Sequence, residues 1–259
     1  MIEPGIFKKY DIRGRAGEVV TEAAAKAIGQ AFGTYLQKQG VRAAIVGRDN
    51  RHSSPALAQA AIAGLARAGC DVTDIGMVAT PLVYWCAVEA GNIGGMMITG
   101  SHLKPDQNGF KLSIGKDNLY GEQIQALRQM IERGELAEGH GQVQTDDSVR
   151  ERYLAMATEK LGRERSLKIV VDAGNGMGGV FGVPLLEALG HQVTCLYCEP
   201  DGSYPNHQPD PQVPANLRDL CERVKQEGAD LGLAFDGDAD RVGVVDDQGN
   251  AIPADRVLI

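Results

Sequence analysis

The chain has 259 residues, of which 43% are hydrophobic and 33 are glycine. This length favours about two domains, and the apolar content is sufficient for buried cores, which excludes a largely disordered chain. The formal net charge is −8, from 26 Lys and Arg against 34 Asp and Glu, and the basic residues form no cluster. This charge pattern argues against a surface for nucleic acid or for an anionic membrane.

The first half of the chain alternates between short apolar runs and segments of helical periodicity. The apolar runs predict strands at residues 43–46, 70–75 and 95–99. A helix is expected after Ser53, where a capping serine precedes Pro55, and Gly69 is expected to close it. Apolar residues at helical spacing predict a further helix over 122–133, with Gly134 as its stop.

The second half repeats this alternation after a polar stretch. Residues 139–147 are polar and predict a connection between domains, which a linking helix over 148–161 follows. Strands are then predicted at 168–171, 192–196 and 230–235, with helices at 179–189 and 215–227. The order strand, helix, strand implies parallel sheets with helical crossovers.

These elements predict an α/β fold: two consecutive three-layer α/β domains with mixed, mainly parallel sheets. We place the domains at residues 1–147 and 148–254. Residues 255–259 resemble the first turn of a helix, with Asp255 as its cap. Because a natural domain seldom stops within an element, we expect a truncated chain in which 255–259 begin a missing third domain.

The sequence also bears on the compartment of the protein. No apolar run approaches the ~20 residues of a membrane helix, and the N-terminal residues do not begin a signal peptide. Five cysteines, an odd number, fit reduced thiols, so we expect a cytoplasmic protein. Cys195 and Cys198 form a C-x-x-C motif within a strand-like run, and we predict that they pack rather than bind zinc or carry redox chemistry.

The strongest chemical signal is Asp236-Gly-Asp-Ala-Asp-Arg241, directly after an apolar run. Loops at the carboxyl ends of strands are where open α/β sheets bind ligands. Small residues between the carboxylates would let all three face one point, and hard oxygen ligands suit Mg²⁺. A solvated acidic turn is the alternative, but clustered acids without a cation repel each other. Arg241 adds a cation that suits phosphate.

A second signal is Thr99-Gly-Ser-His102, followed by a polar segment that reaches Lys111. Ser101 follows a predicted strand beside a glycine, so its hydroxyl could be presented on a strained loop. The motif is not the G-x-S-x-G of hydrolases, because Thr99 and Leu103 occupy the glycine positions. A serine that carries a phosphoryl group needs a divalent ion to screen the charge, which makes the pairing with the acidic loop informative.

Three further segments carry weaker signals. Residues 8–14 are cationic, end in glycine and could clamp an anion or form a surface turn. Residues 47–54 and 172–176 each follow a predicted strand and precede a predicted helix. Both could bind phosphate or serve as structural turns, and we favour turns.

The motifs K-Y-D-I-R-G, T-G-S-H, N-G-F-K, D-A-G-N-G and D-G-D-A-D-R occur in this order from residue 9 to residue 241. Together they resemble the α-D-phosphohexomutase superfamily, and the opening Lys9–Gly14 is similar to its phosphomannomutase/phosphoglucomutase branch. The resemblance implies an enzyme of four domains, of which this chain holds the first two. It also implies an isomerase of carbohydrate metabolism that acts on phosphosugars.

The resemblance implies specific roles for the strongest motifs. Ser101 would be the phosphoserine, which makes the chain a phosphoprotein. Asp236, Asp238 and Asp240 would bind Mg²⁺ together with a phosphate oxygen on Ser101. Arg241 would contact that phosphoryl group.

It implies substrate-directed roles for four other residues. Lys111 and His102 would be candidates for general acid/base work at the sugar hydroxyl, and Tyr10 and Arg13 would line the same cleft. Phosphoserine would exchange its phosphoryl group with a hexose, mannose or glucose, through a 1,6-bisphosphate intermediate, and glucose 1,6-bisphosphate would be the activator. The isolated chain would fold but have little or no activity.

One departure from the family pattern leaves an alternative open. The family usually has S-H-N-P after the serine, whereas this chain has Leu103 and Lys104 at the last two positions. Leucine lacks the hydrogen-bonding groups of asparagine, so a non-catalytic sugar-phosphate or Mg²⁺-binding module is the second hypothesis. A Mg²⁺-dependent phosphatase with an aspartyl nucleophile is disfavoured, because Asp11 lacks a preceding strand.

Overall fold

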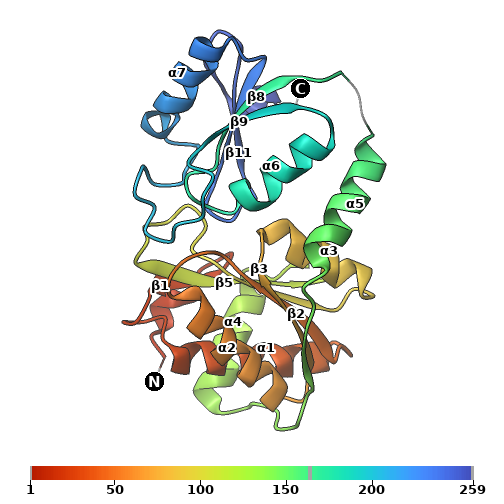
Figure 1. Cartoon of the computed structure of the whole chain (residues 1–259). Helices are drawn as coiled ribbons and strands as arrows, with labels where there is room; N and C mark the ends of the chain where they lie inside the picture. The colour runs from red at the N-terminus through yellow and green to blue at the C-terminus, as the bar shows by residue number, and fades with distance from the viewer. Residues whose placement is uncertain (1, 163–164, 258–259) are drawn as a thin grey trace. The chain divides into compact units, whose positions relative to one another are not determined.

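The computed structural model describes residues 2–162 and 165–257, and its elements are labelled in Figure 1. Contacts divide the chain into two units. The first extends to Gly100 and resumes over Pro105–Val149, and the second comprises Ser101–Lys104 and the chain from Arg150 onward. The serine loop, which the sequence assigns to the first domain, thus groups with the second unit. The boundary between 147 and 148 stays a prediction.

The first unit is built on a mixed sheet with the strand order β1-β5-β4-β2-β3-β7, and β6 pairs with β5. Its strands are β1 (Ile12–Arg15), β2 (Ala43–Arg48), β3 (Asp71–Met77), β4 (Gly94–Ile98), β5 (Gln107–Ile114), β6 (Asp117–Asn118) and β7 (Val143–Thr145). Its helices are the 3-10 turn η1 (Pro4–Ile6), α1 (Glu22–Lys38), α2 (Ser54–Arg67), α3 (Thr80–Glu89) and α4 (Glu122–Arg133). Helix α5 (Val149–Leu161) follows.

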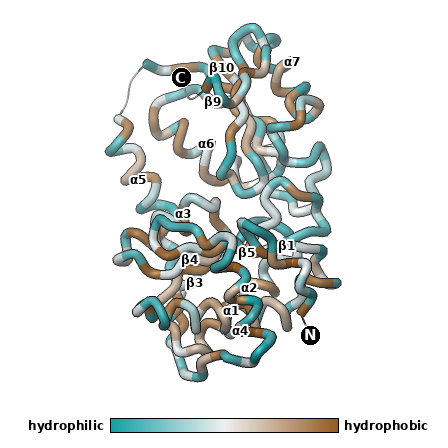
Figure 2. Tube along the Cα trace, turned by 180° about the vertical axis from the view of Figure 1, so that it is seen from behind, coloured by the Kyte–Doolittle hydropathy of each residue, from teal (hydrophilic) through white to brown (hydrophobic). Residues whose placement is uncertain are grey.

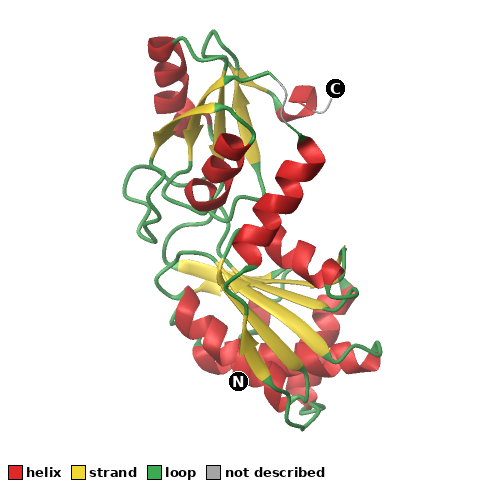
Figure 3. Cartoon of the chain, turned by 45° about the vertical axis from the view of Figure 1, so that its right-hand side comes forward, coloured by secondary structure: helices red, strands yellow, loops and turns green. Residues whose placement is uncertain are grey.

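Helices cover both faces of this sheet, which gives three layers. One core joins α1, α2 and α4 to side chains of the central strands, among them Val46 and Ile98, both fully buried. Helix α3 packs on β2 and β4 outside that core, and Figure 3 shows it on the other side of the sheet. Pairs β2–β3, β2–β4 and β3–β7 are parallel, whereas β4–β5 and β1–β5 are antiparallel.

Several parts of this unit differ from the sequence-based expectation, since β1, β5, β6 and α3 were not predicted. The polar stretch at 139–147, predicted to connect the domains, contains the short strand β7, which pairs in parallel with β3 and was not predicted. The reason is that all three residues of β7 are exposed, and an edge strand held by backbone hydrogen bonds needs no apolar pattern. Helix α1 lay outside the predicted elements. It packs so closely on α2 that a Cβ at Gly29 would stand 2.1 Å from the Ala61 carbonyl oxygen.

The second unit has a smaller sheet with the order β12-β11-β10-β8-β9. Its strands are β8 (Lys168–Asp172), β9 (Gln192–Leu196), β10 (Leu231–Phe235), β11 (Val242–Val245) and β12 (Ala251–Ile252). Its helices are α6 (Gly178–Ala188), the 3-10 turn η2 (Pro214–Leu217), α7 (Arg218–Glu227) and α8 (Ala254–Val257). Strand β8 pairs in parallel with both β10 and β9, whereas the pairs β10–β11 and β11–β12 are antiparallel.

Separate apolar clusters lie on the two faces of this sheet. Leu220 and Val224 of α7 pack with Val170 and Ala234 on one face. The other cluster joins Val183 of α6 to alternate residues of the same strands. Neighbouring strand residues point to opposite faces, so β8 and β10 contribute side chains to both clusters. Figure 2 shows hydrophobic residues in this part of the chain. The prediction of three-layer α/β domains with mixed sheets is therefore confirmed.

Most predicted elements are present, with small shifts at their ends. The helix at 122–133 and the strand at 192–196 have the predicted bounds, and Gly134 adopts the left-handed conformation expected of a helix stop. The expected helix at 215–227 is a 3-10 turn followed by α7. Asp255 lies inside α8 rather than capping it, since the helix begins at Ala254. Residues 258–259 of the predicted third-domain start lie outside the described residues.

No helix within residues 2–162 and 165–257 combines the length and the apolar character needed to cross a bilayer.

Candidate active site

The acidic motif forms a tight loop at the carboxyl end of β10. Oδ1 of Asp236 accepts hydrogen bonds from the backbone N–H groups of Asp240 and Arg241, both at 3.0 Å. The backbone N–H of Ala239 donates to the Asp236 carbonyl, and Ala239 itself has φ of 55°. Oδ1 of Asp236 thus holds the loop closed, whereas Oδ2 accepts a hydrogen bond from the serine described below.

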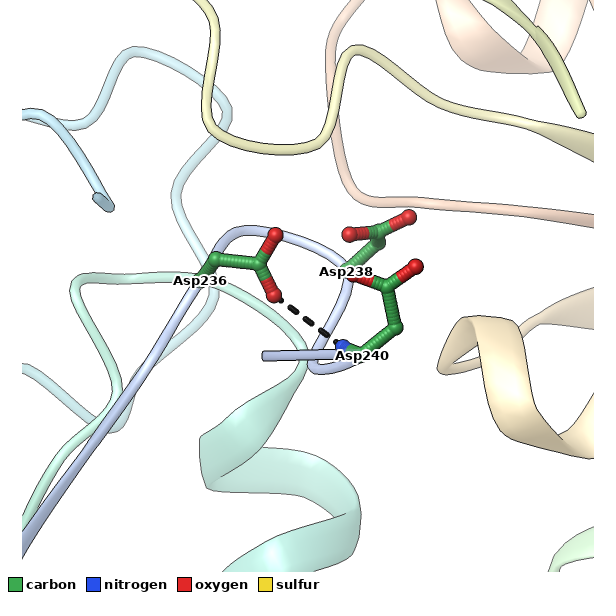
Figure 4. A group of neighbouring side chains, drawn as sticks. All are labelled: Asp236, Asp238 and Asp240. Carbon is green, nitrogen blue, oxygen red and sulfur yellow. Dashed lines mark hydrogen bonds between the residues drawn. The ribbon is translucent and has the colours of Figure 1, made fainter. Parts of the chain in front are cut away.

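The loop gathers its three carboxylates at one place. Asp236, Asp238 and Asp240 each offer an oxygen, and these oxygens lie within 4.8 Å of one another. Asp236 and Asp238 are fully buried, whereas Asp240 is exposed. Figure 4 shows the Asp238 and Asp240 side chains pointing the same way from the curled loop. An all-oxygen set with three negative charges fits Mg²⁺, a hard cation that keeps several water or phosphate ligands.

Ser101 lies beside this loop, in the same unit. Its hydroxyl donates a 2.7 Å hydrogen bond to Oδ2 of Asp236, and its Oγ is 3.3 Å from Nδ1 of His102. Ser101 is 7% exposed and has φ of 49°. For a residue other than glycine the left-handed region costs about 1–2 kcal/mol, so contacts around the loop must hold this conformation. The structure therefore brings together the serine and the acidic loop that the sequence singled out separately.

A buried ion pair in the first unit anchors the backbone just before this serine. Asp49 and Arg51, both fully buried, form a 3.1 Å pair through Nε of Arg51. Oδ2 of Asp49 accepts a 3.0 Å hydrogen bond from the Gly100 N–H, and Nη1 of Arg51 donates to the Gln107 carbonyl. Ser54 Oγ also donates to Asp49. These side chains are used internally, in line with the structural interpretation of residues 47–54.

The predicted substrate residues Arg13 and Lys111 also belong to the first unit. Arg13 pairs with Gly109 across β1 and β5, and Lys111, two residues further on, lies on the same face of the sheet. The close approach requires glycine, because a Cβ at Gly109 would stand 2.2 Å from the Ile12 carbonyl oxygen. Nε of Arg13 also pairs with Asp11 at 2.8 Å. Tyr10 is 65% exposed nearby in sequence.

The remaining predicted residues lie next to the serine and the acidic loop in sequence. His102 is half-buried after Ser101, and the backbone of Arg241 takes part in closing the acidic loop. The second unit thus holds Ser101, His102, Arg241 and the three aspartates, and the first holds Tyr10, Arg13 and Lys111.

The segment 172–176 forms a structural turn. Oδ1 of Asp172 accepts a 2.9 Å hydrogen bond from the Gly174 N–H, and Asn175 is left-handed with φ of 58°. A Cβ at Gly176 would stand 2.6 Å from the Gly237 carbonyl oxygen, so this turn packs directly against the acidic loop. The 172–176 turn therefore packs against the acidic loop and holds it in place.

Sequence reasoning missed His207, which pairs with this turn. Its Nε2 is 3.0 Å from Oδ2 of Asp172. Burial by itself lowers the pKa of His207, but the hydrogen bonds to Asp172 and to the Gln208 carbonyl, together with nearby negative charge, outweigh burial and raise it. The signal available in the sequence was a histidine within the run Asn206-His-Gln-Pro-Asp210. The turn-forming residues of this run predict a loop and do not by themselves indicate a partner for the histidine.

The C-x-x-C motif extends past the end of β9. Cys195 is exposed, and Cys198 is half-buried with its Sγ 3.5 Å from the Leu196 carbonyl. Burial and the neighbouring Cys195 raise the pKa of the Cys198 thiol. A thiol held in its protonated form is a poor metal ligand and a poor nucleophile, which agrees with packing for Cys198, whereas the prediction that Cys195 packs is wrong because its side chain is exposed.

Comparison with known proteins agrees with this architecture. The family description "Phosphoglucomutase/phosphomannomutase, alpha/beta/alpha domain I" matches residues 4–138, and that of domain II matches residues 151–249. The chain is 48% identical over 254 residues to the phosphomannomutase/phosphoglucomutase of Pseudomonas aeruginosa, covering 98% of this chain and 55% of that protein. It is 46% identical to the phosphoglucomutase of Neisseria meningitidis, with the same two coverages.

A solved structure gives the same result. A phosphoglucomutase/phosphomannomutase family protein from Burkholderia thailandensis superposes with a TM-score of 0.95 at 41% identity, covering 99% of this chain and 57% of that one. The chain therefore spans about half the length of the relatives it matches. The resemblance predicted from the motifs is confirmed for both domains of the chain. The chain belongs to the phosphoglucomutase/phosphomannomutase family.

Proposed function

We propose that this chain carries the phosphoserine and metal-binding half of a phosphohexomutase. The reaction would interconvert a hexose 1-phosphate and a hexose 6-phosphate, of mannose or glucose, through a 1,6-bisphosphate. The single observation that carries the proposal is the 2.7 Å hydrogen bond between the Ser101 hydroxyl and Asp236, a member of the three-carboxylate group. A hydroxyl held there is placed to carry a phosphoryl group next to a divalent cation.

The chemistry proposed for Ser101 is reversible phosphoryl transfer. The bond between phosphorus and Oγ of phosphorylated Ser101 breaks, and a bond from phosphorus to a sugar hydroxyl oxygen forms. The hydroxyl proton passes to a general base, for which Lys111 and His102 are the candidates, and Oγ regains a proton. Return of the other phosphoryl group of the bisphosphate to Ser101 completes the exchange.

The other predicted residues have supporting roles in this proposal. Asp236, Asp238 and Asp240 would hold Mg²⁺, which when bound neutralises charge on the transferred group. Arg241 would contact the phosphoryl group on Ser101, and Arg13, on the same sheet face as Lys111, would meet the anionic sugar phosphate with Tyr10. Glucose 1,6-bisphosphate would load the serine, and the cytoplasm would supply the phosphosugars.

Mass spectrometry after incubation with glucose 1,6-bisphosphate and Mg²⁺ tests the proposal. We expect one phosphoryl group, on the peptide that contains Ser101, and none in Ser101→Ala. Ser113→Ala is a matched control, because this serine is buried within β5 of the first unit, whereas the acidic loop belongs to the second. Absence of phosphate on Ser101, both in this chain and in a protein of the relatives' full length, would overturn the proposal.

The same experiment separates the mutase from the non-catalytic alternative. A sugar-phosphate or Mg²⁺-binding module would bind the cation but leave Ser101 unmodified. Replacement of Leu103 and Lys104 by the family's Asn-Pro pair tests whether the departure matters. An unchanged phosphorylation rate in that double variant would show that these two side chains do not limit transfer.

A further inference from the structure

A loop of the second unit, residues 204–210, contacts the segment that carries Ser101. Nε2 of Gln208 donates a 2.6 Å hydrogen bond to the backbone carbonyl of His102, the residue directly after the serine. Gln208 is exposed and 106 positions away along the chain, so the bond depends on how its own loop is held. The Gln208 donor therefore reaches the loop one residue beyond the left-handed Ser101.

The backbone of Gln208 is fixed by three donors. Its carbonyl oxygen accepts from the Asp210 N–H at 2.8 Å, from Nδ2 of Asn216 at 2.8 Å and from Nδ1 of His207 at 2.9 Å. A carbonyl with this many partners cannot rotate without breaking several hydrogen bonds at once. The side chain of Gln208 thus starts from a rigid backbone.

The charge on His207 completes this arrangement. Its Nδ1 faces a carbonyl oxygen and its Nε2 faces the carboxylate of Asp172, 3.0 Å from Oδ2. A carbonyl oxygen and an ionised carboxylate both accept hydrogen bonds, and the imidazolium is the form of the ring whose two N–H groups serve both partners. The side chain is 16% exposed, and the edge of the Tyr197 ring covers it at 5.4 Å between ring centroids.

Other charges near the ring favour the same state. The Tyr197 hydroxyl donates a 2.7 Å hydrogen bond to Oδ2 of Asp219, and the negative charge of Asp219 adds to that of Asp172 at His207. The ion pair between His207 and Asp172 joins the 172–176 turn, which packs against the acidic loop, to the 204–210 loop that carries Gln208. One chain of contacts therefore runs from Asp172 to the Ser101 segment.

We propose that Gln208 and His207 are positioning residues for Ser101. The His207–Asp172 ion pair fixes the Gln208 backbone, and the Gln208 amide holds the His102 carbonyl so that Ser101 keeps its left-handed conformation beside Asp236. The role in phosphoryl transfer rests on the proposed function of Ser101, whereas the holding of the loop does not. Neither residue touches a transferred group in this proposal.

Gln208→Glu is the sharpest variant, because glutamate has nearly the same shape but an ionised carboxylate cannot donate a hydrogen bond. Gln212→Glu is the matched control, since Gln212 is exposed in the same loop region and it is its backbone N–H, not its side chain, that donates to Asp210. Hydrogen–deuterium exchange of the amides of Ser101–Lys104 should be about fivefold faster in Gln208→Glu than in the control, the effect of one lost hydrogen bond.

A kinetic measurement separates positioning from general stability. We expect Gln208→Glu to slow phosphorylation of Ser101 by glucose 1,6-bisphosphate about fivefold. The half-saturating concentration of the bisphosphate and the Tm should be the same in Gln208→Glu as in the Gln212→Glu control. Equal exchange in the two glutamate variants would overturn the role of Gln208. If Ser101 takes up no phosphate either in this chain or in a protein of the relatives' full length, the proposed function fails, and the exchange comparison still decides whether Gln208 holds the loop.

Asp172→Asn tests the His207 part separately. Asparagine keeps an oxygen for the Gly174 N–H but removes the charge that His207 faces. ¹⁵N NMR should show His207 with two N–H groups at pH 7 in wild type and the neutral ring in the variant, and exchange of Ser101–Lys104 should rise. Exchange that stays at the wild-type rate in Asp172→Asn would show that the ion pair does not support the loop.

Discussion

Gly237 lies so close to the Ser101 segment that one added carbon would displace it. A Cβ at this position would stand 2.5 Å from the Ser101 carbonyl oxygen and 3.2 Å from the Tyr204 hydroxyl. The φ of Gly237 is not among the positive ones, so it is the contact, and not the backbone conformation, that requires glycine here. The glycines of the motif loops thus include positions that let two segments of the site meet.

We predict that Gly237→Ala lowers the free energy of unfolding by about 1–3 kcal/mol, the usual cost of overpacking, and weakens Mg²⁺ binding. Chemical denaturation and calorimetric titration measure the two effects. Gly5→Ala is the control, because its Cβ would come no closer than 3.3 Å to the Glu3 side chain. Equal stability of the two variants would contradict the close contact.

Asp238 offers a direct test of the metal site. Asp238→Asn preserves shape but removes one of three converging charges, and we expect Mg²⁺ affinity to fall by at least about tenfold, since even partners of metal ligands cost that much. Asp247→Asn removes the same charge from an exposed position nine residues away. If titration shows the same affinity in both variants, the three aspartates do not form the site.

At the scale of elements, the loops after the strands hold one another in place. The loop after β2 supplies Asp49 and Arg51, which hold the chain where β4 ends and where β5 begins. Removing one partner of a buried ion pair leaves an uncompensated charge. The sequence motif at 47–54 therefore acts through the neighbouring loops rather than through a ligand.

Arg51→Met should lower the free energy of unfolding by about 3–5 kcal/mol, because it leaves the Asp49 carboxylate buried without its cation. Urea denaturation monitored by circular dichroism measures the change. Arg67→Met is the matched control, since its pair with Glu138 has side chains 52% and 72% exposed and should contribute little. Similar losses in both variants would show that burial of the Asp49–Arg51 pair is not what stabilises this region.

The His207–Asp172 pair predicts a pH dependence of stability. The pKa of His207 is raised by folding, so its stabilisation is fully present below the ordinary value of 6.5 and is lost as pH rises through the raised folded value. The Tm difference between wild type and Asp172→Asn should therefore be larger at pH 6 than at pH 9. A difference that does not change with pH would argue against a charged His207.

At the scale of the whole molecule, the chain holds two α/β/α units and about half the length of its relatives. We predict that it folds and binds Mg²⁺ alone but converts mannose or glucose 1-phosphate far more slowly than a protein of the relatives' full length. The reason is that Ser101, Arg241 and the three aspartates are proposed to act on the phosphoryl group that is transferred. The bisphosphate intermediate carries a second phosphoryl group, which must also be bound for efficient conversion. A coupled assay measures the conversion, and equal rates for the two proteins would contradict the prediction.

Local sequence was sufficient for much of the fold. Apolar residues at helical spacing and Gly134 defined the helix at 122–133 without reference to the rest of the chain. By contrast, β7 could not be predicted, because its exposed residues have no apolar pattern and its backbone partners lie on β3, about 70 residues away. Helix α1 was not predicted, although Ile28, Phe32 and Leu36 recur at helical spacing and are fully buried in the core.

The sequence alone determined that this protein is an α/β member of its family, and it singled out Ser101 and three aspartates as the predicted chemical residues, because motifs and periodicity are local properties. Only the tertiary structure decided that Asp236 holds the Ser101 hydroxyl, that Asp49 and Arg51 are buried as a pair, and that the Gln208 amide meets the His102 carbonyl. Each of these facts joins positions far apart in the chain, and such distances are set by packing.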